Sequence, residues 1–410
     1  MGDITKNNRI ITLDILRGFA VLGILAMNIQ SFALPSNIFV DPQAGGGNPV
    51  DNIISYLIGF IFFEGKMRGL FSLLFGASMM LFIERAHAAG QNPVTSQLRR
   101  LFWLGILGLL HMFLIWDGDI LFLYAVVGSA AMLVRSWHPN KLIIVAIALF
   151  ATGVVFNASS RIEKTKLEMA IYDGSATTEQ KNTYAENTKE LKTYAAEERE
   201  IYAYSYPAMV KYRLTEERSL PAIYVIYTFL ETMPLMMLGI AFYQNGLLTG
   251  VWEDNRYRKL AWQYLGSGAI LSGMLAIMLV AYDFRPSLTF TTHRVFNVIP
   301  QYLMTIGYAA LFILWAKRYA LTLAGGRMAA VGRMAFTNYI MTSIIMTSLF
   351  NGYGMAYWGK YNLVQLWLFV IGTWLVMLLW SKPWLNHFQY GPLEWLWRSL
   401  AKGQMQPMRR

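Results

Sequence analysis

The sequence has 410 residues, of which 55% are hydrophobic and only 14% are charged, whereas soluble domains usually carry about 25% charged residues. So few polar side chains cannot cover the two or three soluble domains that this length would otherwise suggest, so we expect an all-α polytopic membrane protein. The absence of cysteine excludes disulfide frameworks, thiolate metal sites and cysteine nucleophiles.

The formal net charge of +11 is also typical of nucleic-acid-binding proteins. In a membrane protein, however, Lys and Arg gather in the short cytoplasmic loops. The polar segment 161–218 holds 10 basic and 11 acidic residues, which leaves 25 basic and 13 acidic residues elsewhere. The excess positive charge therefore belongs to the loops, and we expect no nucleic-acid partner.

A helix needs about 20 mainly apolar residues to cross a bilayer. Nine stretches of the chain have this pattern, and a tenth stretch, residues 53–84, carries charges in its middle. The nine stretches lie near residues 10–34, 98–116, 119–134, 140–157, 220–243, 259–282, 294–316, 334–352 and 362–380. The sequence therefore predicts a bundle of about ten transmembrane helices.

Glu64, Lys66 and Arg68 interrupt the apolar run of residues 53–84. A continuous helix of that length would be about 48 Å long, well beyond a hydrocarbon core of ~30 Å. Non-helical backbone at membrane depth is tolerated only where protein or a water-filled cavity surrounds it. The charges thus predict a broken helix beside a cavity. The alternative is a short interfacial helix joined to an ordinary span.

The charges of the loops decide how often residues 53–84 cross. If they cross once and the amino terminus is inside, the inner loops hold most of the Lys and Arg, for example Arg99, Arg100, Arg256 and Arg258. This is the bias that cytoplasmic loops show, and two crossings would invert it. We therefore expect both termini in the cytoplasm and a location in the bacterial inner membrane, with membrane lipids as partners.

The polar segment between the two membrane halves mixes Glu, Lys and Ala at helical spacing. It predicts an extracytoplasmic helical insert that is either a surface cap or an element that docks a partner or gates a substrate. Its tyrosines are expected to form a seam, and they are Tyr184, Tyr194, Tyr202, Tyr204 and Tyr206.

The expected domains follow from the alternation of apolar and polar segments along the chain. They are the N-terminal transmembrane half 1–158, the insert 159–219, the C-terminal transmembrane half 220–380 and a cytoplasmic interfacial tail 381–410. In the tail, Trp384, Trp395 and Trp397 lie beside basic residues. That pattern is typical of the inner membrane interface, where Trp lies at headgroup level and Lys or Arg meets anionic lipid.

Asp14, Arg17 and Asn28 share one stripe of the first span. Asp14 and Arg17 are three residues apart, so they can pair on one helix face. Asn28 follows Arg17 by eleven residues, which returns almost to the same face after a rise of ~16 Å. Ionisable residues at membrane depth are costly and by default indicate a functional site.

His111 lies in the outer half of its span, at about the depth of Asn28, and Asp117 and Asp119 follow in a short turn. A histidine with carboxylates nearby can act as a general base, because its neutral form is accessible at about pH 7. The alternative is a structural hydrogen bond between neighbouring helices. The other histidines lie in loops or at span ends without the spacing of a metal site, so no metal is expected.

Several motifs occur in an order that matches a bacterial family. They are LDILRGFAVLGILAMN, FFEGKMRGLFSLLFGASM, RRLFWLGILGLLHMFLIWDGDILFLYAVVG, GRMAFTNYIMTSIIMTSLFNGYG and YGPLEWLWRSL. On these motifs the chain resembles the YeiB family, whose carboxyl half is the domain of unknown function 418. The resemblance covers nearly the whole chain except the polar insert, and by itself it implies no particular activity.

More distantly, the opening LD-x-LRG-x-A pattern is similar to that of transmembrane acyltransferases, namely the acyltransferase-3 superfamily and the heparan-alpha-glucosaminide N-acetyltransferase group. The similarity implies a helical bundle that passes an acyl group from cytoplasmic acyl-CoA to an acceptor outside. The first group commonly has a histidine at the position of Asn28, and the second has one in the following loop, where residues 35–51 of this chain have none. His111 is then the candidate base at membrane depth.

The leading hypothesis is therefore acyl transfer in an outward-opening polar cavity. In it His111 deprotonates an acceptor hydroxyl or amine, and Asn28 orients the acceptor or stabilises the oxyanion. The residues expected around this cavity are Asn28, Glu64, His111, Asp117 and Asp119. Those expected to bind acyl-CoA, the possible donor, are Arg17, Lys66, Arg68, Arg333 and Asn338. No tightly bound cofactor is expected.

Two other classes of function fit the same residues. A transporter or exporter would use the broken segment and the buried ionisable residues as a pathway for a small-molecule substrate or protons. A non-catalytic homodimer would hold a lipid or quinone as an apolar passenger, for which the 23 methionines and the aromatic residues are suited. The sequence does not identify the small-molecule or envelope substrate.

Overall fold

The computed structural model describes residues 10–410, except for the side chains of residues 190–192, 194 and 195. Every named element in this part of the chain is helical, and the pairing of Phe388 with Arg409 is an isolated bridge rather than a strand. The all-α class predicted from the composition is therefore confirmed.

Seven helices are long and apolar enough to cross a membrane. They are α1 (Ile11–Ala33), the segment formed by α2 (Pro49–Ile58) and α3 (Lys66–Ala88), α6 (Pro139–Tyr172), α9 (Leu220–Gln244), α10 (Asp254–Ala281), α12 (Val298–Tyr319) and α15 (Leu363–His387). Three more run beside them, namely α4 (Pro93–Leu114), α5 (Leu121–Val134) and α14 (Ala335–Phe350). The protein is therefore a polytopic helical membrane protein, and the count of ten passes stays a prediction.

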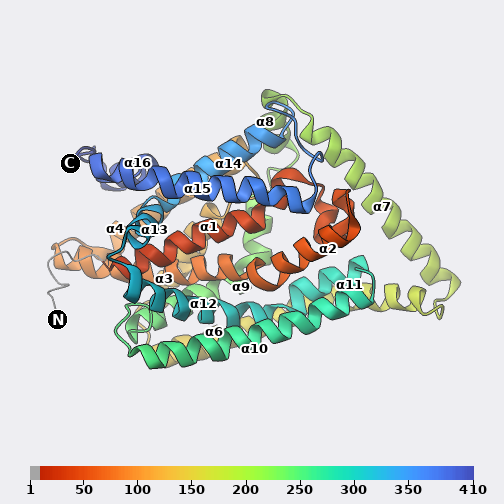
Figure 1. Ribbon diagram of the computed structural model, residues 1–410, viewed down its shortest axis with the longest axis horizontal. Coiled ribbons are helices and arrows are strands. Elements are labelled where there is room, and N and C mark those ends of the chain that lie inside the picture. Colours follow the sequence, from red (N-terminus) through yellow and green to blue (C-terminus); the bar gives the residue numbers. More distant parts are fainter. Residues whose placement is uncertain (1–9) are drawn as a thin grey trace.

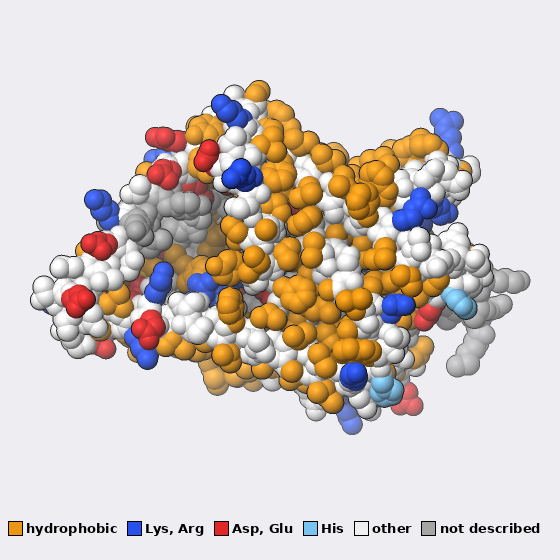
Figure 2. All heavy atoms as spheres, turned by 180° about the vertical axis from the view of Figure 1, so that it is seen from behind, with side chains coloured by type: hydrophobic (Ala, Val, Ile, Leu, Met, Phe, Trp, Pro, Cys, Tyr) orange, Lys and Arg blue, Asp and Glu red, His pale blue; other side chains and the backbone are white. Residues whose placement is uncertain are grey.

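The start of α1 and the C-terminal end of the chain lie at the same end of the bundle (Figure 1). We call this the tail end, because it carries the C-terminal helix α16 (Pro392–Lys402). The opposite end carries α7 (Thr178–Tyr202) and α8 (Tyr206–Thr215), and we call it the insert end. Apolar side chains cover the middle of the face in Figure 2, and charged side chains gather toward its two ends, as expected for a bundle in lipid. That the tail end faces the cytoplasm stays a prediction.

Helix α1 lies at the centre of the bundle, where it contacts α3, α12, α14, α15 and the short helix α13 (Leu323–Arg333). Gly332 permits the close approach of α13, because a Cβ atom there would lie 1.8 Å from the carbonyl oxygen of Asp14. Helices in lipid gain stability from such close backbone packing, since lipid is as apolar as their own side chains. The polar stripe of α1 is therefore enclosed by other helices.

The helix predicted to be broken at Glu64 is broken there. After α2 the chain forms a π-helical turn, η3 (Gly59–Phe63), and Glu64 then has φ −52° and ψ 121°. Gly65 has a left-handed φ of 70°, which only glycine adopts without strain, and α3 begins at Lys66. Pi-helical turns and backbone breaks inside membrane helices often mark functional sites.

The insert extends from the long helix α6, whose 34 residues reach about 51 Å and so pass well beyond a hydrocarbon core of ~30 Å. The chain turns at Asp173, continues as α7, and meets the bundle again at Tyr202, whose hydroxyl donates to the carbonyl oxygen of Ser31. The tyrosine seam was a wrong prediction among the described side chains. Tyr202 stacks instead on Trp358, while Tyr204 and Tyr206 meet Tyr212 and Tyr353 edge to face, because α7 ends at Tyr202.

The tail is attached to the bundle by hydrogen bonds as well as by its aromatic rings. The Glu394 carboxylate of α16 accepts hydrogen bonds from the backbone N–H groups of Phe336 and Thr337, in the first turn of α14. The Trp397 indole donates to the carbonyl oxygen of Arg100 on α4. The tail therefore caps α14, which the sequence pattern did not indicate.

Candidate functional site

His111 and Asp119 form a buried pair near the insert end. His111 is on the last turn of α4, and Asp119 closes the turn into α5. The Nδ1 atom of His111 lies 2.7 Å from Asp119 Oδ1, and the exposed fractions of the two side chains are 1% and 0%. Gly108, three residues before His111, allows this close turn, because a Cβ atom there would lie 2.4 Å from the backbone nitrogen of Phe122.

Hydrogen bonding fixes the direction of the His111 ring. The other oxygen of Asp119 accepts from the backbone N–H of Phe122 at 2.9 Å, so the carboxylate is held on both sides by donors. With Asp119 ionised, His111 Nδ1 carries the hydrogen in the shared bond, which leaves Nε2 of the neutral ring as an acceptor. Among the described residues His111 Nε2 has no hydrogen-bond partner, although it is buried.

The surroundings of the pair are mainly aromatic. The rings of Tyr339 and Trp116 lie 5.2 Å and 6.4 Å from the His111 ring, and the Tyr339 hydroxyl is 3.4 Å from the backbone nitrogen of Ile120. Trp116 stacks on Phe32 at the end of α1. A base in such a dry environment acts in a low dielectric, where oriented dipoles and charges have larger effects than in water.

Asp117 does not join this pair. Its Oδ1 lies 3.7 Å from Nη2 of Arg213, a buried residue of α8, and its side chain is 31% exposed. Burial and the Asp117 charge raise the pKa of Glu217 from 4.5 to about 7, although Arg213 opposes the shift. The insert is thus bound to the α4–α5 turn by a cluster of two carboxylates, Asp117 and Glu217, and one arginine, Arg213.

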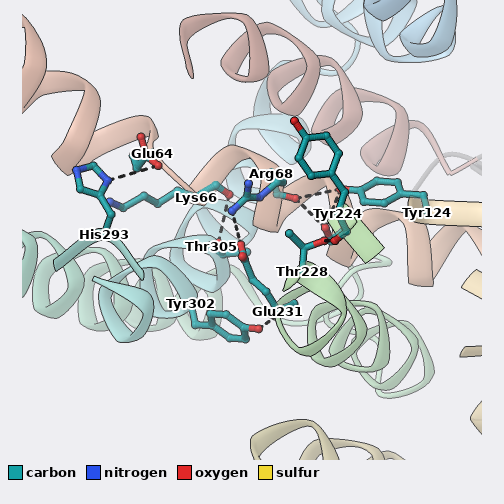
Figure 3. A network of polar contacts seen from close by, with 11 residues as sticks. Glu64, Lys66, Arg68, Tyr124, Tyr224, Thr228, Glu231, His293, Tyr302 and Thr305 are labelled. Atoms are coloured by element: carbon teal, nitrogen blue, oxygen red, sulfur yellow. Dashed lines mark hydrogen bonds and ion pairs between the residues drawn. The ribbon is translucent and has the colours of Figure 1, made fainter. Parts of the chain in front are cut away.

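A second polar network occupies the break between α2 and α3 (Figure 3). The Lys66 ammonium is fully buried and donates to the carbonyl oxygen of Phe60 at 2.6 Å. Arg68 forms an ion pair with Glu231 on α9. The Tyr302 hydroxyl donates to the backbone carbonyl of Glu231 at 2.7 Å. The break is therefore held in place by groups from α9 and α12.

The break also borders a cavity. His293, in the π-helical turn η4 (Thr292–Phe296), has Nδ1 3.6 Å from Glu64 Oε1 and Nε2 2.7 Å from the Tyr56 hydroxyl. These three side chains and Gln30 line a cavity of about 290 Å³ including its open mouth. The cavity predicted near Glu64 is therefore present, although its enclosed part has room for only about one water molecule.

The single cavity predicted around Asn28, Glu64, His111, Asp117 and Asp119 is not what the structure contains. Glu64 lies at the helix break, His111 pairs with Asp119, and Asp117 faces the insert. Asn28 is half-buried and makes no side-chain hydrogen bond within the described residues. Position along a helix does not give the direction in which a side chain points across the bundle.

The residues predicted to bind acyl-CoA also divide between places. Lys66 and Arg68 belong to the helix break, so the prediction that they meet phosphates at the inner surface is not supported by their position. The Asn338 amide donates to Val331 and Ser381 and accepts from Trp380, and this joins α13, α14 and α15.

Arg17 and Arg333 lie toward the tail end. Arg17 pairs with Asp14 at 2.8 Å, as predicted, and donates to Ser78 at 2.7 Å. Arg333 donates to the carbonyl oxygen of Gln389 in the tail. The positive charges of Arg17 and Arg398 both act on Arg100, so a concentration of arginine charge lies at this end of the bundle.

Sequence reasoning missed His293, Tyr56 and Glu231. His293 precedes the span at 294–316 and was assigned to a loop, and Tyr56 resembles an ordinary interfacial aromatic residue. Glu231 could have been found from the sequence, because an isolated carboxylate inside the apolar stretch 220–243 indicates a buried polar site. His293 could be found only from the fold, since η4 turns it back toward the break.

Comparison with known proteins gives the family. A family described as a protein of unknown function (DUF418) matches residues 242–404. The chain is 30% identical to the uncharacterized protein YxaH of Bacillus subtilis (strain 168), over 98% of this chain and 96% of that protein. It is also 30% identical to the uncharacterized protein YeiB of Escherichia coli (strain K12), over 96% of each chain. No solved structure matches. Because these relatives align over nearly their full length, the chain belongs to the YeiB family of membrane proteins, whose C-terminal part is the DUF418 region.

Proposed function

We propose that the protein transfers an acyl group from acyl-CoA to an acceptor that reaches His111 from the insert end. The observation that carries the proposal is the state of the His111 ring: Nδ1 is held by Asp119, while Nε2 is buried and has no partner among the described residues. A histidine oriented by a carboxylate, with its second nitrogen free, is the arrangement that general-base catalysis needs.

In the proposed reaction, His111 Nε2 takes the proton from an acceptor hydroxyl or amine. The acceptor attacks the thioester carbonyl, the carbon–sulfur bond breaks, and the leaving thiolate takes the proton from the imidazolium to give free CoA. Asp119 stabilises the imidazolium and keeps its orientation through both proton transfers. The proposal assigns no part in proton transfer to Asp117, whose carboxylate is paired with Arg213.

The donor would bind at the tail end. Arg17, Arg100 and Arg398 concentrate positive charge there, and the guanidinium group suits phosphate oxygens. Arg100 and His111 are on the same helix, eleven residues apart, so the pantetheine arm would have to span ~16 Å. The similarity of the LD-x-LRG-x-A pattern to transmembrane acyltransferases supports this class of donor.

The test uses the purified protein in lipid nanodiscs with acetyl-CoA labelled in the acetyl group and an extract of the cell envelope. The expected result is label in an envelope component, at a rate that depends on the amount of protein. Label that stays in acetyl-CoA or appears only as free acetate would contradict the proposal, because no acceptor would then have received the group.

Transport is the second candidate, and the break between α2 and α3 is the observation that favours it. Transporters often bind substrates and coupling ions where a membrane helix is discontinuous, and here Glu64, Lys66 and the Arg68–Glu231 pair surround such a point. Reconstituted protein should then take up a substrate under a pH gradient, and Glu64→Gln should abolish the uptake. Covalent change of the acceptor without net flux would exclude this candidate.

A further inference from the structure

The cavity at the helix break contains a hydrogen-bond pattern that acyl transfer at His111 does not use. Its polar wall comes from three separate parts of the chain: Tyr56 on α2, Glu64 at the break and His293 in η4. Figure 3 shows the His293 ring directed at the Glu64 carboxylate. Glu64 is 28% exposed and His293 is 11% exposed, so both side chains are open to the cavity.

Tyr56 determines which nitrogen of His293 carries a hydrogen. The Tyr56 oxygen lies 2.8 Å from the carbonyl oxygen of Phe39 and 2.7 Å from His293 Nε2. A carbonyl oxygen cannot donate, so the one hydroxyl hydrogen of Tyr56 must be in the contact with Phe39. The contact with His293 then needs a hydrogen on Nε2. His293 is therefore protonated at Nε2, and its Nδ1 atom faces Glu64.

Nδ1 and Glu64 Oε1 are 3.6 Å apart, beyond the length of a direct hydrogen bond, and a hydrogen on either group would make their approach favourable. Without one, the lone pair of Nδ1 would face a carboxylate oxygen at 3.6 Å, and two acceptors would oppose each other. One proton removes this conflict in either of two positions. On Nδ1 it gives an imidazolium beside a carboxylate, and on Glu64 it gives a neutral imidazole beside a carboxylic acid.

The charged groups around the pair are few. Lys66 and Arg68 follow Glu64 on α3, and Asp41 acts on Tyr56 from the turn after α1. Lys66 is bonded to Phe60 and Arg68 to Glu231, so neither cation supplies the hydrogen missing between Nδ1 and Glu64. The wall that α1 contributes is uncharged and consists of Ala26, Met27 and Gln30.

We propose that Glu64 and His293 together hold one exchangeable proton and form a proton-binding site reached through cavity water. Its release leaves a neutral His293, an ionised Glu64 and one hydronium ion in the cavity, so charge and hydrogen balance. The site does not depend on acyl transfer at His111. If the protein is a transporter, this site is where a proton would bind during the cycle.

The test measures proton occupancy of both groups at about neutral pH, by NMR of protein in nanodiscs that carries 15N-labelled histidine and 13C-labelled glutamate side chains. The signals of His293 and Glu64 are identified by their loss in His293→Gln and Glu64→Gln. We expect His293 to carry a hydrogen on Nε2, and either His293 to be doubly protonated or Glu64 to be protonated. A neutral His293 beside an ionised Glu64, or a hydrogen on Nδ1 with none on Nε2, would overturn the proposal.

Two variants add independent readouts. In Glu64→Gln the side-chain amide can donate to Nδ1, so neutral His293 should carry its hydrogen on Nε2. Tyr56→Phe removes the acceptor that selects this tautomer, so the Nε2-protonated fraction should fall several-fold. Unchanged His293 signals in both variants would contradict the inference. Asp119→Asn should leave the His293 signals unchanged, so the proton site can be tested independently of acyl transfer at His111.

Discussion

Glu198 of α7 holds Ser36, the residue that begins the turn after α1. Both carboxylate oxygens accept from the backbone N–H of Ser36, at 3.1 Å and 2.9 Å, and one of them accepts from its hydroxyl at 3.1 Å. The two residues are 162 positions apart in the sequence. The insert is therefore fastened to the central helix of the bundle.

Glu198→Ala should loosen this attachment locally. Loss of the acceptors leaves the partly buried N–H of Ser36 without a partner, which costs ~1–3 kcal/mol. Hydrogen exchange should become about tenfold faster or more in residues 36–45 and at the end of α7. Glu186→Ala, an exposed site on the same helix, is the matched control and should change nothing. Equal exchange in the two variants would show that the bonds do not hold the insert.

Glu217 should make stability depend on pH. Its pKa in the folded protein is about 7, raised from 4.5 by burial and by Asp117. Between these values the folded state holds a proton that the unfolded state has lost, so the free energy of unfolding decreases as pH rises through this window. Thermal unfolding at about pH 5 and about pH 8 should show a decrease in Tm with pH that is smaller in Glu217→Gln. If Tm changed with pH equally in the native protein and in Glu217→Gln, groups other than Glu217 would be responsible for the pH dependence.

Close helix contact should be sensitive to single methyl groups. A Cβ atom at Gly76 of α3 would lie 2.2 Å from the carbonyl oxygen of Met236 on α9. Gly76→Ala should therefore lower stability by ~1–3 kcal/mol through overpacking. Gly273 of α10 has no atom within 4 Å of such a Cβ, so Gly273→Ala should be neutral or stabilising. Comparable Tm values for the two variants in one detergent would contradict the packing between α3 and α9.

The tail should contribute to stability as a cap on α14. Besides accepting from the N–H groups of Phe336 and Thr337, Glu394 accepts from the Thr337 hydroxyl, and these bonds satisfy the start of that helix. Glu394→Ala should lower the free energy of unfolding by ~2 kcal/mol or more. Glu253→Ala, at an exposed acidic residue, should have no such effect. If the two substitutions had equal effects, the tail would be only an interfacial anchor.

The sequence was sufficient for the class of fold and for local features. Hydrophobic length predicted the passes, and the charges at Glu64, Lys66 and Arg68 predicted the break, because membrane helices tolerate such groups only where the interior is irregular or wet. The short turn after His111 predicted carboxylates near it but did not distinguish Asp119, which contacts the ring, from Asp117, which pairs with Arg213.

The sequence was not sufficient to show which polar residues meet across the bundle. His293 reaches Glu64 because η4 folds back at the start of α12, and Arg68 reaches Glu231 because α9 packs on α3. Apolar periodicity does not encode these contacts, since most lipid-facing and most buried positions in such helices are apolar alike. For the same reason the chain could not indicate that Asn28 lies apart from both His111 and Glu64.

The most direct measurement of the central claim is the rate of acetyl transfer by four forms of the protein: the native chain, His111→Gln, Asp119→Asn and His87→Gln. His87 is exposed at the end of α3 and serves as the control. The account predicts that His111→Gln lowers the rate by ~10²–10⁴-fold. Asp119→Asn should also be slow, because His111 Nδ1 and the Phe122 N–H both donate to this side chain and an amide can accept from only one side. Transfer at the native rate in His111→Gln would contradict the account.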